Sequence, residues 1–234
     1  ADFFGVACIE EAIELRTAGL SKTLVLLMEG IFELSELALA IKNNLIITVC
    51  SPLQLEWILN ATINKKIDVF IKHDSGMGRL GFQDAQFKEA ISSLEKSNNI
   101  NKITLMTHFS SADNLESKTT SEQVIDFENA VGSHNYSLSL ANSAAILAWE
   151  STHKDYTRPG IMLYGSSPFK DTLQQKKLAP VMTLSSSLIS IKNFKAGQSI
   201  GYGERFICKK DTLIGVVAIG YADGYPRSAA DGAP

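Results

Sequence analysis

The sequence predicts a (β/α)8 barrel whose first strand lies before residue 1, followed by a β-rich C-terminal domain. Over the first 164 residues, seven apolar, strand-like runs alternate with amphipathic helical patterns, the arrangement that builds a parallel sheet with helices outside. Beyond Pro180 the helical patterns stop and strand-like runs take over. A doubly wound open sheet is the alternative, but no GxGxxG follows an early strand, so the usual reason to prefer a dinucleotide-binding fold is missing.

The expected barrel strands span residues 3–8, 23–28, 45–50, 67–73, 103–109, 136–140 and 160–164. Helix signals lie between them. Ser51, Pro52 and Gln54 combine an N-cap serine, a proline at the first helical position and a capping-box glutamine. Asp84 is expected to cap the helix that follows a glycine-rich loop. Each strand with its helix forms one βα unit, and the repetition of these units favours the barrel.

The character of the sequence changes after Tyr164. Residues 166–177 are polar, and strand-like runs follow at 181–191, 198–202 and 212–219. We therefore predict a barrel domain at residues 1–174 and the start of a β-rich domain at residues 175–234. The chain begins without a methionine inside a strand-like run, so we expect it to be the ordered middle of something longer.

Composition narrows the class of protein. Of the 234 residues, 45% are hydrophobic and 20% are charged, which is ordinary for a soluble protein with a sizeable core. The longest apolar run, residues 213–222, is shorter than the roughly 20 residues that span a bilayer. A net charge of −3 without a lysine or arginine run predicts no nucleic-acid partner. Three separated cysteines without metal-ligand spacing predict reduced thiols in a cytoplasmic protein and no metal site.

The loop at residues 72–82 reads Lys-His-Asp-Ser-Gly-Met-Gly-Arg-Leu-Gly-Phe and follows an expected strand. Its three glycines allow the backbone to pass close to a ligand. Arg79 offers a permanent charge and a rigid fork of donors, which suits a carboxylate or a phenolate.

The first part of this loop and five further segments together resemble the motifs of alanine racemase in order and approximate spacing. They are residues 72–79, 107–113, 141–145, 158–165, 201–203 and 220–227. The resemblance covers essentially the whole chain. It implies a barrel that binds pyridoxal 5′-phosphate, and a homodimer in which the β domain of one subunit completes the site of the other.

The resemblance implies roles for the cofactor contacts. Arg158 matches the arginine that faces the pyridine nitrogen, although a structural ion pair with Asp155 is the alternative interpretation. His108 matches the histidine that links the catalytic tyrosine to Arg158. The positions that match the phosphate-binding residues are Asn142, Ser143, Gly160 and Ile161.

It also implies roles around the substrate. Arg79 matches the arginine that contacts the cofactor phenolic oxygen and the substrate carboxylate. Tyr202 matches the tyrosine base, and Tyr221 a second tyrosine near the substrate entrance. Lys72 matches a lysine that is carbamylated in several family members. Strand alternation places Lys72 and Asp74 on the same side of the chain.

Some family features are missing or changed. The lysine that attaches the cofactor sits at the end of the first barrel strand, before residue 1, and the C-terminal motif with further contacts is absent. Ser75 replaces the usual threonine, and His73 a usual apolar residue.

The expected function is two-base racemisation of L-alanine and D-alanine, which supplies D-alanine for peptidoglycan. The alternatives are a racemase for another small amino acid and a non-catalytic pyridoxal-phosphate-binding barrel that has no β domain. A decarboxylase on the same two-domain plan is disfavoured, because its glycine-rich phosphate motif and its cysteine motif are not seen.

Overall fold

The computed structural model describes residues 1–133, 135–170 and 178–229. The chain divides into two compact units, Ala1–Val181 and Met182–Pro234. The boundary that we predicted between residues 174 and 175 lies outside the described residues.

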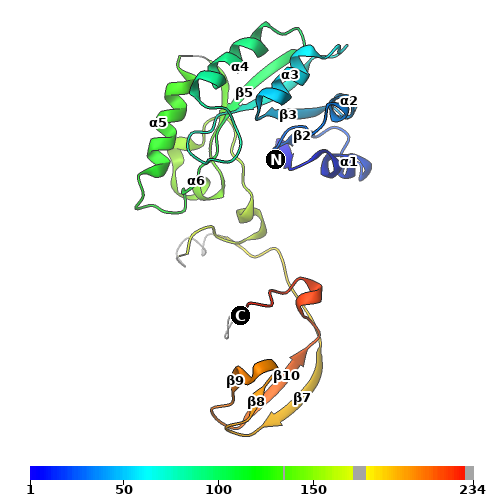
Figure 1. Cartoon of the computed structure of the whole chain (residues 1–234), viewed down its shortest axis with the longest axis vertical. Coiled ribbons are helices and arrows are strands. Elements are labelled where there is room, and N and C mark those ends of the chain that lie inside the picture. The colour runs from blue at the N-terminus through cyan, green and yellow to red at the C-terminus, as the bar shows by residue number, and fades with distance from the viewer. Residues whose placement is uncertain (134, 171–177, 230–234) are drawn as a thin grey trace. The chain divides into compact units, whose positions relative to one another are not determined.

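The first unit is a parallel six-stranded sheet whose strands follow one another in chain order, with helices between them (Figure 1). The strands are β1 (Phe3–Val6), β2 (Leu24–Leu27), β3 (Leu45–Val49), β4 (Ile67–Lys72), β5 (Ile100–Met106) and β6 (Ser137–Ser139). The helices are α1 (Ile9–Thr17), α2 (Leu34–Lys42), α3 (Pro52–Asn60), α4 (Asp84–Lys96), α5 (Thr119–Val131) and α6 (Ser143–Ala148). Sequential parallel strands with helices between them are part of a (β/α)8 barrel, as the sequence predicts.

Both faces of this sheet are buried. Alternate strand residues such as Val69 and Ile71 pack into the main apolar core with the helices. The residues between them, such as Phe70, join a second cluster with Leu26 and Met106 on the opposite face. Because side chains alternate along a strand, the continuation of β4 places Lys72 on the Phe70 side and His73 on the helix side.

Helix α3 begins as the sequence predicts. The Ser51 side chain accepts a hydrogen bond from the Gln54 N–H, and Pro52 is the first helical residue. Gln54 differs from a capping-box residue, because its side-chain oxygen accepts from the N–H of Cys50 at 2.7 Å.

The prediction of a seventh strand at residues 160–164 is wrong. Residues 160–164 contain a short 3-10 helix, Ile161–Tyr164, and the described part of the first unit has six strands. The chain instead meets β6 earlier, through a single bridge between Ser139 and Tyr156. Pro159 has no N–H to donate to a ladder, so a regular strand cannot continue through it.

The second unit is β-rich, as expected. Strand β7 (Leu188–Phe194) pairs antiparallel with β10 (Thr212–Val217), and β8 (Ser199–Ile200) pairs antiparallel with β9 (Phe206–Ile207). The expected run at 181–191 becomes a strand only from Leu188. Tyr202 lies in a 3-10 helix, Tyr202–Glu204, rather than in the strand expected at 198–202.

Among the described residues, every helix is too short or too polar to cross a bilayer.

Candidate active site

The loop after β4 is closed at its base by two backbone hydrogen bonds. The N–H of Phe82 donates to the Lys72 carbonyl at 2.8 Å, and the N–H of Asp74 donates to the Phe82 carbonyl at 2.9 Å. Gly81 makes this closure possible, because it has a φ of +125° and a Cβ there would lie 2.9 Å from the Lys72 oxygen.

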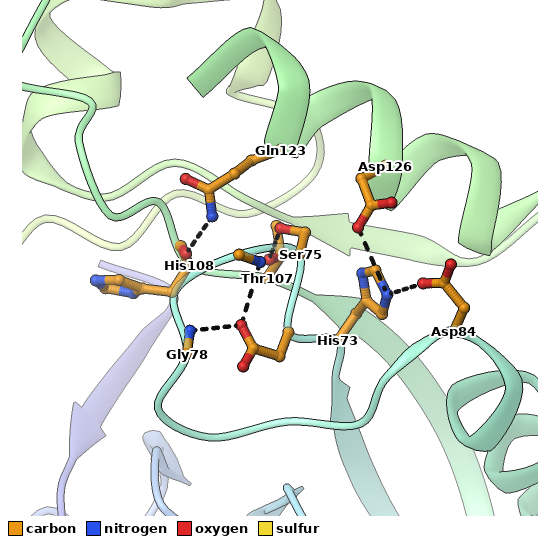
Figure 2. Close-up of polar contacts among 10 residues, drawn as sticks. His73, Ser75, Gly78, Asp84, Thr107, His108, Gln123 and Asp126 are labelled. Carbon is orange, nitrogen blue, oxygen red and sulfur yellow. Dashed lines mark hydrogen bonds and ion pairs between the residues drawn. The ribbon is translucent and has the colours of Figure 1, made fainter. Parts of the chain in front are cut away.

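Asp74 shapes the rest of this loop. Its Oδ1 accepts hydrogen bonds from the N–H groups of Gly76 at 3.2 Å and Gly78 at 2.9 Å, and Figure 2 shows the second of these. Ser75 is buried and shares a 2.6 Å hydrogen bond with the Thr107 hydroxyl at the end of β5. The loop is therefore stabilised by its own Asp74 side chain and by Thr107 of the adjacent strand end. It carries Arg79 as an exposed residue.

His73 ties this strand end to the helices. Its buried ring donates through Nε2 to Asp84 Oδ1 at 2.7 Å, and Asp126 Oδ2 lies 4.0 Å from the same nitrogen (Figure 2). Because a carboxylate only accepts, Nε2 carries the proton of this hydrogen bond, and the other ring nitrogen, Nδ1, is buried without a partner among the described residues. The expectation that Asp84 caps α4 is wrong. Asp84 is the first helical residue, and its carboxylate binds His73.

Three cations surround the ends of β4 and β5. Lys72 is only 3% exposed, and the described residues give its ammonium group no hydrogen-bond or ion-pair partner. Burial lowers the pKa of Lys72, and the nearby charges of Arg79 and Arg158 lower it further. Burial also raises the pKa of the neighbouring Cys50 thiol to about 11, so this thiol is neutral. The site therefore has an excess of positive charge that favours an anionic ligand.

His108 is neutral at physiological pH. Burial is the main cause that lowers its pKa to about 4, and the charges of Arg158, Lys72 and Arg79 add to the shift. The described hydrogen bonds of Arg158 go to other groups, so the structure links it to His108 through electrostatic repulsion.

Arg158 is fixed by oxygen atoms from two strand ends. Nη1 donates to the Ser139 hydroxyl, and Nη2 donates to the Thr107 carbonyl and, at 3.1 Å, to the Leu140 carbonyl. Its Nε is buried without a partner. Burial lowers the pKa of Arg158 to about 10. The alternative ion pair with Asp155 is wrong, because that carboxylate accepts from the N–H of Leu138.

The structure brings together the expected phosphate-binding positions. Ser143 Oγ accepts from the Gly160 N–H at 2.8 Å, and the N–H of Met162 lies 3.4 Å from the same oxygen. Asn142 caps α6 by accepting from the Ala145 N–H, so the hydroxyl of Ser143 is available to the loop that leads into Ile161.

The two tyrosines lie in the second unit. Tyr202 is fully exposed, and Tyr221 is 74% exposed in a short 3-10 helix, Tyr221–Asp223. The structure positions each of them only within its own unit.

Sequence reasoning missed two polar residues that support this site. Ser139 on β6 binds Arg158, and Gln123 on α5 contacts the loop that follows β5. The available signal for Gln123 was a glutamine on the face of α5 that also carries Thr120 and Phe127, at helical spacing.

Two family models match this chain. The model described as alanine racemase, N-terminal domain, matches residues 1–168, and the model described as alanine racemase, C-terminal domain, matches residues 181–234. The chain belongs to the alanine racemase family. Both halves of the expected organisation, a barrel part and a β-rich part, thus have their counterparts in the alanine racemase family.

Individual relatives agree with this family. An alanine racemase from Pseudomonas fluorescens is 48% identical over 235 residues, which cover 100% of this chain and 66% of that protein. A catabolic alanine racemase from Pseudomonas putida is 46% identical with the same coverage. The crystal structure of the biosynthetic alanine racemase from Pseudomonas aeruginosa has a TM-score of 0.92 at 40% identity and covers 98% of this chain and 64% of that chain. The chain spans about two thirds of the length of the curated relatives that it matches.

Proposed function

We propose that the protein to which this chain belongs interconverts L-alanine and D-alanine with pyridoxal 5′-phosphate and two bases, and supplies D-alanine for peptidoglycan. The observation that carries this proposal is the unpaired Nε of Arg158. A buried donor without an acceptor costs about 1–3 kcal/mol, so a ligand that brings an acceptor is favoured there. An unprotonated pyridine nitrogen is such an acceptor, and arginine cannot protonate it.

The other residues present fit the same cofactor. Arg79 would bind its phenolic oxygen together with the substrate carboxylate. The phosphate would be held by a hydroxyl and backbone N–H groups contributed by Asn142, Ser143, Gly160 and Ile161. When bound, the cofactor supplies an electron sink for the α-carbon of the substrate. The attachment lysine would lie before residue 1.

The bases follow from the stereochemistry. Racemisation removes a proton from one face of the α-carbon and returns a proton to the other face, so two bases on opposite faces are the simplest arrangement. We assign the L-face to Tyr202 and the D-face to the attachment lysine. Neutral His108 would donate its ring N–H to the Tyr202 oxygen and so stabilise the phenolate form that acts as a base, while Tyr221 would line the entrance.

The second domain distinguishes this function from the alternatives. A non-catalytic cofactor-binding barrel has no β domain, whereas residues 181–234 match the C-terminal domain of the alanine racemase family. The names of the relatives favour alanine over another small amino acid. We also propose that the protein works in the cytoplasm as a homodimer, because the family resemblance implies that the β domain of one subunit, which carries Tyr202, completes the site of the other. A monomer that is fully active in sedimentation experiments would contradict this assembly.

A chiral assay tests the proposed function. The full-length protein, supplied with the cofactor, should convert L-alanine to D-alanine and D-alanine to L-alanine. Both reactions should stop at equal amounts, because enantiomers have equal free energies in water. Chiral chromatography measures the two forms. Consumption of alanine without its enantiomer, or no conversion by the cofactor-loaded protein, would contradict the proposal.

We further propose that Lys72 is carbamylated. Burial lowers the pKa of Lys72, which increases the fraction of neutral amine, the form that adds carbon dioxide. The carbamate would place a negative charge beside Arg79 and Arg158, where Lys72 now adds a third positive charge. We expect native mass spectrometry to show one carbon dioxide adduct that Lys72→Ala lacks. An unmodified wild-type protein under bicarbonate would rule the carbamate out.

A further inference from the structure

Gln123 lies on the face of α5 that points toward the loops after β4 and β5 (Figure 2). It is only 3% exposed, although its neighbours on that face include the apolar Phe127 and Ala130. A buried amide is tolerated when its polar atoms find partners, and here the partners are backbone groups of the candidate site. We propose that Gln123 is a positioning residue that holds the backbone of His108 and Ser110 in place beside the candidate site, an inference that rests on the proposed function for its catalytic meaning.

The amide of Gln123 forms hydrogen bonds with the residues on both sides of Phe109. Its Oε1 accepts from the Ser110 N–H at 3.0 Å and from the Ser110 hydroxyl at 3.2 Å. Its Nε2 donates to the His108 carbonyl at 3.3 Å. The orientation of the amide is fixed by these partners, because a backbone N–H can only donate and a carbonyl can only accept.

Gln123 also touches the loop that carries Arg79. A Cβ built on Gly76 would lie 3.5 Å from Gln123 Cγ, so Gln123 lies beside this glycine and a side chain added there would contact it. Gly76 is in turn held by Asp74. One side chain therefore binds the loop after β5 and lies beside the loop after β4.

The imidazole of His108 points away from Gln123 (Figure 2). Its low pKa depends on burial and on the charges of Arg158, Lys72 and Arg79. Thr107 is already held by Arg158 and Ser75. The next carbonyl along the chain, that of His108 itself, is held by Gln123. Without that contact the His108 backbone gains freedom, its ring gains water, and its pKa rises toward the ordinary value.

Gln54 offers a matched control. It is also a buried glutamine, 7% exposed, and it also makes three hydrogen bonds to loop backbone. Those bonds join the ends of β2 and β3, to Cys50, Glu29 and Ile31. Gln54→Met therefore removes an equivalent set of hydrogen bonds between a glutamine side chain and loop backbone, but at a different pair of loops.

The experiment follows His108 by NMR in the full-length holoenzyme labelled with ¹³C-histidine, with the signal assigned through His108→Gln. We expect the His108 pKa to lie below the ordinary histidine value in the wild-type protein and to rise by about one unit in Gln123→Met, with little change in Gln54→Met. Gln123→Asn keeps the amide but is one methylene shorter, so it should give a smaller rise. If Gln123→Met does not fold, the His108 titration in Gln123→Asn tests the proposal instead.

Kinetics provide a second readout. If Gln123 positions His108, Gln123→Met should lower kcat more than it changes KM, and the acidic limb of the pH profile of kcat should move to higher pH. A folded Gln123→Met or Gln123→Asn variant whose His108 titrates as in the wild-type protein would overturn the proposal. The NMR result does not depend on racemisation, so failure of the proposed function would be recognised separately by the chiral assay.

Discussion

Replacing Tyr202 with phenylalanine in the full-length protein is expected to slow α-proton abstraction from L-alanine by about 10²–10⁴, the usual contribution of a positioned base. Abstraction from D-alanine should be largely spared, because the attachment lysine serves that face. The expectation rests on the proposed partnership of Tyr202 with His108, which is neutral because burial and neighbouring cations hold its pKa near 4.

Deuterium exchange at the α-carbon of each enantiomer in D₂O measures the two faces separately. Tyr136→Phe is the control, because Tyr136 precedes β6 at the end away from the candidate site and its hydroxyl binds Glu95. Only the Tyr202 variant should lose exchange selectively. If both enantiomers keep their exchange rates in Tyr202→Phe, then Tyr202 is not a base.

The second large effect is expected for Arg158→Met. The substitution leaves the Thr107 and Leu140 carbonyls without their donor, at about 1–3 kcal/mol for each buried group. It also removes the donor that we assign to the pyridine nitrogen. We therefore expect a lower free energy of unfolding, weaker cofactor binding and a raised pKa of His108, since the Arg158 charge is one cause of its low value.

Arg158→Lys separates charge from geometry. Lysine keeps a positive charge but lacks the planar fork that reaches several oxygen atoms at once. The pKa of His108 should therefore stay low in this variant, while the unfolding free energy and the cofactor affinity still fall. Urea unfolding, a cofactor titration and the His108 NMR signal measure the three quantities. Equal free energies of unfolding for Arg158→Met and the wild-type protein would show that the Arg158 hydrogen bonds do not stabilise the fold.

Protonation of His108 makes the free energy of unfolding depend on pH, and the direction of this contribution follows from its pKa. Its pKa is lower in the folded protein than in the unfolded chain, so below the ordinary histidine value of about 6.5 the unfolded chain binds the proton first. This group therefore contributes a loss of stability as the pH falls from about 6.5 toward 4. Below that range both states are protonated and the contribution levels off.

Much of the barrel could be predicted from the sequence because parallel strands buried on both faces are continuous apolar runs. The runs that became β2, β3 and β4 are of this kind. The strand predicted at residues 160–164 is instead a 3-10 helical turn, because an apolar run of five residues does not by itself distinguish a strand from a helical turn. The residues between β6 and this turn pair with β6 through one bridge, which no local pattern reveals.

The site itself was only partly visible in the sequence. Residues in motifs, such as Arg79 and Ser143, stand out because they follow strands. Gln123 does not, because its role depends on a helix face meeting two loops that are distant in sequence. Asp84 differs from its predicted capping role for a related reason. A carboxylate at a helix start usually caps it, but here a buried histidine offered a partner.

The donor role of Arg158 Nε is tested most directly by ¹⁵N NMR of the full-length protein loaded with pyridoxal 5′-phosphate labelled at the ring nitrogen. Because arginine keeps its own proton, the ring nitrogen should show the chemical shift of an unprotonated pyridine that accepts a hydrogen bond. The shift should change in Arg158→Lys. A ring nitrogen that is protonated in the wild-type protein at neutral pH, or whose shift is the same in Arg158→Lys, would contradict the assignment of the buried, unpaired Nε to the cofactor.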